Sequence, residues 1–174
     1  MPKRFDISSE TTAEYSKLLY GLTLNDFRKQ YLGSYFGLAW AFIQPLTFIL
    51  VIWTVFEFGF RAGSTAEGVP FVLWLLAGII PWLFVSDAIR SGTEALISQA
   101  FLVKKIAFKL SILPMVKIST SLIIHLGLMF FLVVALLSYG YWPTIHWLQL
   151  LYYVASAYVL TLGISWISSA IRVF

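Results

Sequence analysis

Residues 118–171 contain no lysine, arginine, aspartate or glutamate, and this uncharged run limits the folds that the chain can adopt. As a single α-helix the run would be about 81 Å long, whereas the hydrocarbon core of a bilayer is only about 30 Å thick. We therefore expect two membrane spans, at about residues 115–138 and 147–170. Between them lies the aromatic turn sequence Tyr139-Gly140-Tyr141-Trp142-Pro143, which suits a membrane interface.

Two further uncharged stretches precede this run. The stretch from Gln30 to Phe56 predicts a span at about 35–58, and the stretch from Gly68 to Ser86 predicts one at about 71–87. Of all residues 60% are hydrophobic and 11% are charged, against about 25% charged in soluble domains. We therefore expect an all-α integral membrane protein in which residues 32–174 form a transmembrane domain with at least four helices.

Residues 1–31 differ from the rest because they are polar to amphipathic. A T-x-x-E capping box at residues 11–14 predicts the start of a helix. Apolar side chains then recur at the spacing of one helical face, at Tyr15, Leu18, Leu19 and Leu22. We expect this helix to lie in the membrane interface, and the alternative is an ordinary helix packed on a partner. No apolar signal-peptide core is visible in this segment.

The basic residues are distributed unevenly between the two sides of the expected spans. Five lie in residues 1–34, five in residues 88–117 and one at Arg172, whereas the loops at 61–70 and 139–146 hold one and none. The positive-inside rule then places the N-terminus and the 88–117 region in the cytoplasm, with the spans in the inner membrane of a bacterium. Since this placement accounts for the net charge of +4, we expect no nucleic-acid partner.

Sequence signatures of catalysis are not apparent. The chain has no G-x-x-x-x-G-K-[ST], no G-x-S-x-G, no H-E-x-x-H and no cysteine. We therefore expect no enzyme activity, no metal and no cofactor in this chain. His146 is expected at an interface and His125, inside a span, is best explained as an interhelical hydrogen bonder. Glu57 and Asp87 at the edges of spans admit both a functional and a paired interpretation.

Two blocks of motifs are more specific. The first contains Arg28, Tyr31, Ser34, Gly37, Trp40 and Pro45-Leu46. The second contains Gly78-Ile79-Ile80-Pro81-Trp82, then Lys104-Lys105 with Phe108, then Leu113-Pro114. In order and spacing these motifs, over about residues 15–174, resemble the permease subunits of type-2 ABC exporters of lipid-linked polysaccharides. The chain departs from that family at Lys109-Leu110, where Pro-Arg is common. Because the family has six spans, the resemblance also implies two further helices beyond Phe174.

The resemblance implies a role in export. Two copies of the permease and two ATPase subunits, which would carry ATP and magnesium, would export an undecaprenyl-linked polysaccharide such as O-antigen, teichoic acid or capsule. A cytoplasmic coupling region at 95–112 would dock on the ATPase, although a surface loop lying on lipid is the alternative. The side chains expected to make that contact are Phe101, Leu102, Lys104, Lys105, Ile106 and Phe108.

The resemblance also points to a glycan entrance where the interfacial helix meets the first span. Arg28 and Lys29 would bind the lipid pyrophosphate, and the aromatic rings of Tyr31, Tyr35 and Trp40 would take the first sugars. The alternative is that the two cations only anchor the helix to anionic lipid. Two other functions remain open at this point, namely export of a small lipophilic drug and an integral-membrane enzyme acting on lipid-linked sugars.

Overall fold

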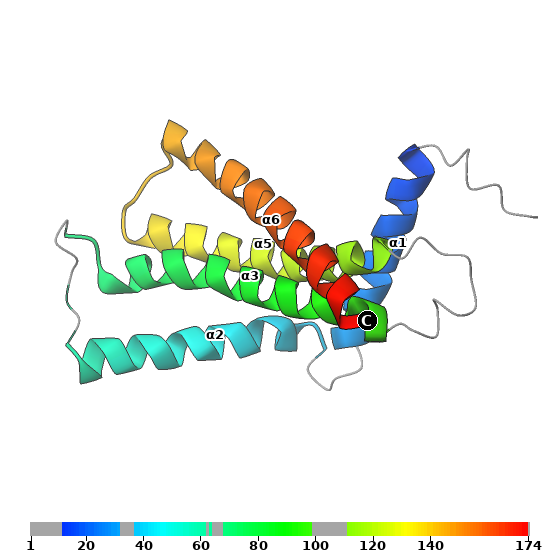
Figure 1. The fold of residues 1–174 in the computed structure, drawn as a ribbon. Helices are drawn as coiled ribbons and strands as arrows, with labels where there is room; N and C mark the ends of the chain where they lie inside the picture. The colour runs from blue at the N-terminus through cyan, green and yellow to red at the C-terminus, as the bar shows by residue number, and fades with distance from the viewer. Residues whose placement is uncertain (1–11, 32–36, 62, 64–67, 99–110, 174) are drawn as a thin grey trace, which may run out of the picture.

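The computed structural model describes residues 12–31, 37–61, 63, 68–98 and 111–173 (Figure 1). These residues form helices and short connections, and they contain no strand. The helices are α1 (Thr12–Tyr31), α2 (Ala39–Thr54), α3 (Phe71–Ser98), α5 (Ile112–Ser138) and α6 (Leu148–Val173). A π-helical turn, Val55–Gly59, extends α2, and a 3-10 turn, Ile145–Trp147, leads into α6.

Four helical stretches are long and apolar enough to cross a membrane. They are Ala39–Gly59, Phe71–Ser98, Ile112–Ser138 and Ile145–Arg172. The expected all-α membrane fold is thus confirmed, and the chain is a multi-pass membrane protein. The helix of the second span continues well past residue 87 to Ser98, so it includes the first residues of the 95–112 region. Residues 99–110 lie outside the described residues, and Ile112 begins α5.

Helices α3 and α5 are central, because they pack against each other and both pack against α2 and α6; α5 also packs against α1. The connections α2–α3 and α5–α6 lie at one end of the bundle, which we call the loop end (Figure 1). At the opposite end lie α1, the end of α3, the start of α5 and the end of α6. We call this the charged end, since it carries the charged residues Asp26, Asp87, Arg90, Glu94, Lys117 and Arg172.

Two apolar clusters hold the bundle together. Towards the loop end, Ile49 of α2 packs between Leu76 and Ile80 of α3 and Leu128 and Leu132 of α5. The second cluster lies nearer the charged end and joins α3, α5 and α6. Its buried members are Phe84, Ala88, Ile118 and Leu162. Helix α2 therefore contributes only to the first cluster, and much of its apolar surface stays exposed.

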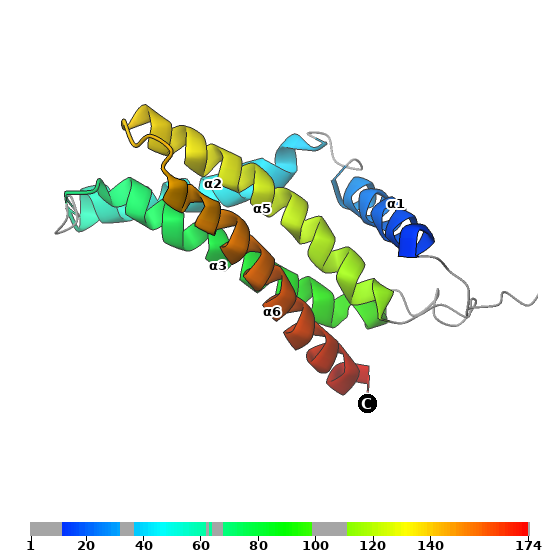
Figure 2. The ribbon, with the colours of Figure 1, turned by 90° about the horizontal axis from the view of Figure 1, so that it is seen from above.

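Helix α6 crosses α3 closely at one place and then diverges from α5 towards the loop end (Figures 1 and 2). At the crossing the side chains are small: Gly92 of α3 faces Ser165 of α6, whose hydroxyl donates a hydrogen bond of 3.4 Å to the carbonyl of Ala88. Thr161 and Ser169, one turn away on either side of Ser165, are also buried. Small residues of this kind let two membrane helices approach closely.

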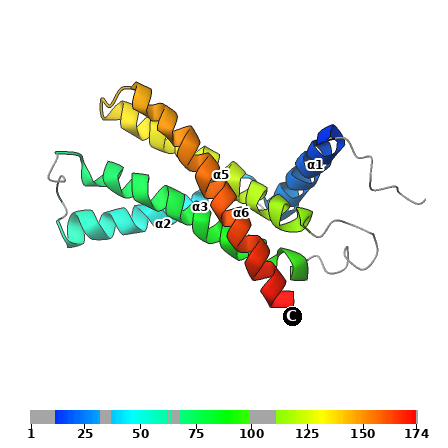
Figure 3. The ribbon, with the colours of Figure 1, turned by 45° about the horizontal axis from the view of Figure 1, so that its top comes forward.

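Helix α1 lies across the charged end and packs on the first half of α5 (Figure 3). The hydroxyl of Tyr15 donates a hydrogen bond of 3.6 Å to the sulfur of Met115. On the apolar stripe of α1, Leu19 and Leu22 are half-buried and Leu18 is exposed. The stripe is therefore only partly covered by this chain, and its placement in a membrane interface stays a prediction.

The α3–α6 crossing provides a test of the fold. Replacing Gly92 by alanine would put a methyl group 2.5 Å from the Ser165 hydroxyl oxygen and 2.7 Å from its Cβ. The two helices must then move apart, so we expect Gly92→Ala to lower the free energy of unfolding by about 1–3 kcal/mol. A matched control is Gly163→Ala on α6, because a Cβ there meets no atom within 4 Å. Equal stability of both variants in a detergent unfolding titration would contradict this packing.

Candidate functional site

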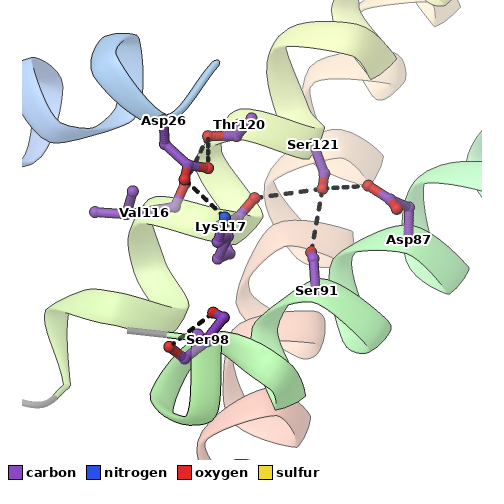
Figure 4. A network of polar contacts seen from close by, with 9 residues as sticks. Asp26, Asp87, Ser91, Ser98, Val116, Lys117, Thr120 and Ser121 are labelled. Atoms are coloured by element: carbon purple, nitrogen blue, oxygen red, sulfur yellow. Dashed lines mark hydrogen bonds and ion pairs between the residues drawn. The ribbon is translucent and has the colours of Figure 1, made fainter. Parts of the chain in front are cut away.

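One turn of α5, Lys117 to Ser121, holds both α1 and α3 (Figure 4). On one side, the ammonium of Lys117 pairs with Asp26 of α1 at 2.7 Å, and the Thr120 hydroxyl donates to the same carboxylate at 3.1 Å. On the other side, the hydroxyl of Ser121 donates to the carboxylate of Asp87 on α3 at 2.6 Å. Two helices, α1 and α3, are thus joined by polar contacts to three residues within about one turn of α5.

The Asp26–Lys117 pair is shielded from solvent. The Asp26 side chain is 12% exposed and that of Lys117 is 22% exposed. Coulomb attraction between such charges is screened less than at the surface, and removing one partner leaves the other charge without compensation. The pair therefore fixes α1 against α5 more firmly than a surface ion pair would.

Asp87 is paired twice. Besides the bond from Ser121, its carboxylate accepts a hydrogen bond of 2.8 Å from the guanidinium of Arg90, one turn further along α3. Asp87 was one of the two acids whose role the sequence left open. The structure shows it as a paired residue, and the same carboxylate also lies in the wall of a groove.

This groove has a volume of about 420 Å³ and lies between the end of α1, the first half of α2, α3 and α5. Its wall combines polar and apolar side chains. The polar ones are Gln30, Tyr31, Gln44, Asp87, Arg90, Ser121 and His125. The apolar ones are Ala41, Pro45, Phe48, Leu83, Phe84, Ile124 and Leu128. We call it the polar groove, because a second groove between α5 and α6 is lined almost wholly by apolar side chains.

His125 closes the inner part of the polar groove. Its side chain is 3% exposed, and its ring stacks on Phe84 with 4.8 Å between the ring centres. Its Nδ1 atom is buried and has no hydrogen-bond partner within the described part of the chain. A buried polar atom without a partner is costly, so this nitrogen is a candidate contact for a bound molecule.

Tyr31 stands at the mouth of the polar groove, where α1 ends. Burial raises the pKa of its phenol to about 12, and the nearby negative charge of Asp87 adds to the rise. The hydroxyl therefore stays protonated at any physiological pH. It can both donate and accept a hydrogen bond at the groove mouth.

The expected entrance residues are only partly brought together. Tyr31 lines the polar groove, whereas Arg28 and Lys29 are exposed in the last turn of α1 and do not line it. Trp40, in the first turn of α2, is 45% exposed and is not part of the groove wall. Tyr35 lies outside the described residues, as do the six expected ATPase contacts between residues 101 and 108.

Sequence reasoning missed most of this groove. Gln44 and Arg90 were not singled out, and His125 was interpreted as an interhelical hydrogen bonder. One signal was present: Gln44 and His125 are polar side chains within apolar spans, and such residues usually face the protein interior or a cavity. The signal could not show that both residues share one cavity with Asp87.

Comparison with known proteins supports the family resemblance. No protein-family model matches the chain. The chain is similar to O-antigen export permeases. It is 29% identical over 164 residues to the O-antigen export system permease protein RfbA of Myxococcus xanthus, a match that covers 92% of the chain. Two proteins of the same name from Klebsiella pneumoniae are 27% and 26% identical over 159 residues, or 90% of the chain. The chain spans 60% of the length of each relative.

These comparisons confirm the family resemblance that the sequence motifs indicated. The alignment to each relative includes nearly all of the chain, so it extends well beyond the short motif blocks around Trp40 and Pro81. The relatives are named as permeases of an export system. A transport role, rather than a catalytic one, follows for the kind of protein that this chain resembles.

The Asp26–Lys117 pair can be tested with a double-mutant cycle. We expect Asp26→Asn and Lys117→Met to interact by about 1–3 kcal/mol, because the two residues touch in a shielded place. The measurement is the free energy of unfolding of each single variant and of the double variant in detergent. The matched control is the pair Glu94 and Arg172, which is 3.5 Å apart with both side chains about half exposed. Its interaction should stay below about 1 kcal/mol. Equal interaction energies in the two cycles would contradict the conclusion that the shielded Asp26–Lys117 pair is stronger than a surface ion pair.

Proposed function

We propose that the chain is the transmembrane subunit of an ATP-driven ABC transporter that exports an undecaprenyl-linked polysaccharide. The observation that carries this proposal is the similarity of nine-tenths of the chain to O-antigen export permeases. The four membrane-length helices agree with it. The names of the relatives favour neither a drug exporter nor an enzyme acting on lipid-linked sugars. Among the three polysaccharide classes, they favour O-antigen over teichoic acid and capsule.

The orientation of the subunit follows from charge. Of the charged residues that the structure describes, those at the charged end include the cations Arg90, Lys117 and Arg172, and the loop end has Arg61. By the positive-inside rule, the charged end faces the cytoplasm of a bacterium and the loop end faces outwards. Helix α1 would then lie at the level of the cytoplasmic headgroups.

The partners of the subunit follow from the chemistry that transport requires. Export against a gradient needs an energy source, and the sequence has no P-loop. A separate ATPase subunit would bind ATP and magnesium and would dock at the cytoplasmic coupling region between α3 and α5. A second copy of the permease would complete the pathway, with the lipid-linked glycan as substrate.

Docking on the ATPase can be tested at Phe101 and Phe108. Phe101→Asp or Phe108→Asp would put a charge into an apolar contact, so we expect the ATPase to detach while the permease still inserts into the membrane. The measurements are co-purification of the ATPase and its rate of ATP hydrolysis. The controls Phe101→Leu and Phe108→Leu keep the contact apolar and should retain the partner. Full co-purification and full ATP turnover in both Asp variants would contradict docking at this site.

Headgroup capture at the end of α1 can be tested by an export assay. Arg28→Gln combined with Lys29→Gln removes two exposed cations next to the groove mouth. If the pair binds the lipid pyrophosphate, export should fall at least tenfold and lipid-linked polymer should accumulate inside, with normal insertion and ATPase binding. Lipid anchoring alone is worth about 1 kcal/mol per cation and would leave export near normal. Lys17→Gln, an exposed cation earlier on α1, is the control. Undiminished export in the double variant would refute headgroup capture.

A further inference from the structure

We propose that the polar groove binds a neutral sugar unit of the exported glycan, with Gln44, Asp87 and His125 hydrogen-bonding its hydroxyl groups. This inference rests on the proposed function. It adds a binding site within a single subunit and separates the place where sugar is bound from the place where the lipid pyrophosphate is bound. Four observations carry it: charge, hydrogen-bonding capacity, the shape of the wall and position along the helices.

The charges of the groove favour a neutral ligand. Its lining contains one anion, Asp87, and one cation, Arg90, which are paired at 2.8 Å. To bind Arg90, a pyrophosphate would have to break the ion pair between Arg90 and Asp87, and the carboxylate of Asp87 would then repel it. The two exposed cations nearby, Arg28 and Lys29, lie outside the groove. The groove is therefore suited to groups that carry no charge.

The hydrogen-bonding groups of the groove suit hydroxyls. A hydroxyl both donates and accepts, and so do the amide of Gln44 and the phenol of Tyr31. Asp87 can accept through its carboxylate, as it does from Ser121. The buried Nδ1 of His125 has no partner among the described residues, and a ligand hydroxyl would supply one. A purely apolar ligand, such as a polyprenyl chain, would leave this atom and the Gln44 amide unmatched.

The apolar part of the wall suits the other face of a sugar ring. Phe48 is 47% exposed, and it lies on the same wall as Pro45 and Gln44, on successive turns of α2. A sugar ring presents C–H groups on its faces and hydroxyls around its edge, so it fits a wall with both characters. The volume of about 420 Å³ lies within the usual size of small-molecule sites, about 300–1,000 Å³.

The groove extends from the charged end into the membrane-spanning part of the bundle. His125 follows Lys117 by eight residues on α5, or about 12 Å at 1.5 Å per residue. A sugar bound beside His125 would have its hydroxyls satisfied by protein at a depth where lipid offers no partners. The groove thereby supplies a first step for a polar chain that must leave the cytoplasm.

The test compares two probes on the full-length permease with its ATPase partner in lipid nanodiscs. The first probe is lipid-linked glycan purified from cells in which the permease gene is deleted, and the second is undecaprenyl pyrophosphate without sugar. Loss of one hydrogen bond should weaken binding of the first probe about fivefold in Gln44→Leu and in His125→Leu. Binding of the second probe should not change. Microscale thermophoresis measures both affinities.

The chain offers a control for each substitution. Gln149 and His146 are exposed at the loop end of the molecule and do not line the groove, so Gln149→Leu and His146→Leu should leave both affinities unchanged. If His125→Leu fails to fold, Gln44→Leu decides the question, since Gln44 is exposed in this structure. Equal weakening for both probes would overturn the proposal, because the groove would then hold the lipid part. Unchanged affinity for both probes would overturn it as well.

The outcome also separates this proposal from the proposed function. If deletion of the permease gene causes no lipid-linked glycan to accumulate, the proposed export function is wrong, and the proposed sugar site is refuted together with it. If glycan accumulates, and Gln44→Leu binds it as tightly as the unaltered protein does, only the sugar site is refuted.

Discussion

The polar contacts of Lys117, Thr120 and Ser121 are the constraint on which the arrangement at the charged end depends. Apolar packing between membrane helices is non-directional, and lipid tails compete for the same surfaces. The carboxylates of Asp26 and Asp87 restrict how α1 and α3 can slide and rotate against α5, because each must meet its partner on α5 at hydrogen-bonding distance. They fix α1 and α3 on opposite sides of one turn. The polar groove is the space that remains between these two helices, α2 and α5.

A polar groove is compatible with this membrane protein because its charges cancel locally. Arg90 and Asp87 neutralise each other, and the remaining lining consists of amides, hydroxyls, an imidazole and apolar side chains. The exposed cations Arg28 and Lys29 stand outside at the end of α1. A lipid-linked glycan has the same division, with a charged pyrophosphate beside a chain of neutral sugars. Under the proposed function, separate parts of the entrance would match separate parts of the substrate.

Much of the fold could be predicted from the sequence, because long uncharged runs can only be accommodated in a bilayer. Residues 118–171 required two helices, and the break at Gly140 was visible as a turn. The groove could not be predicted in the same way. Gln44, Asp87 and His125 lie on three helices, and their proximity depends on how those helices rotate about their axes. The contact of Asp26 with Lys117, 91 positions later, leaves no periodic signal either. The sequence showed which of these residues are polar or charged, but it did not show that they lie together in one groove.

The crossing of α3 and α6 has a mechanical consequence. The two helices approach most closely where Gly92 meets Ser165, and α6 then diverges from the bundle towards the loop end. Because α3 and α6 meet through small side chains at this place, the contact can act as a pivot between the two helices. Rotation about that pivot changes the opening at the far end by a large amount, yet it alters few contacts near the pivot. The wedge between α5 and α6 is lined by apolar side chains alone except for Tyr158, whose hydroxyl is hydrogen-bonded to that of Ser119 on α5 at 2.9 Å. From this bond towards the loop end, the width of the wedge can vary in lipid without breaking a hydrogen bond along its walls.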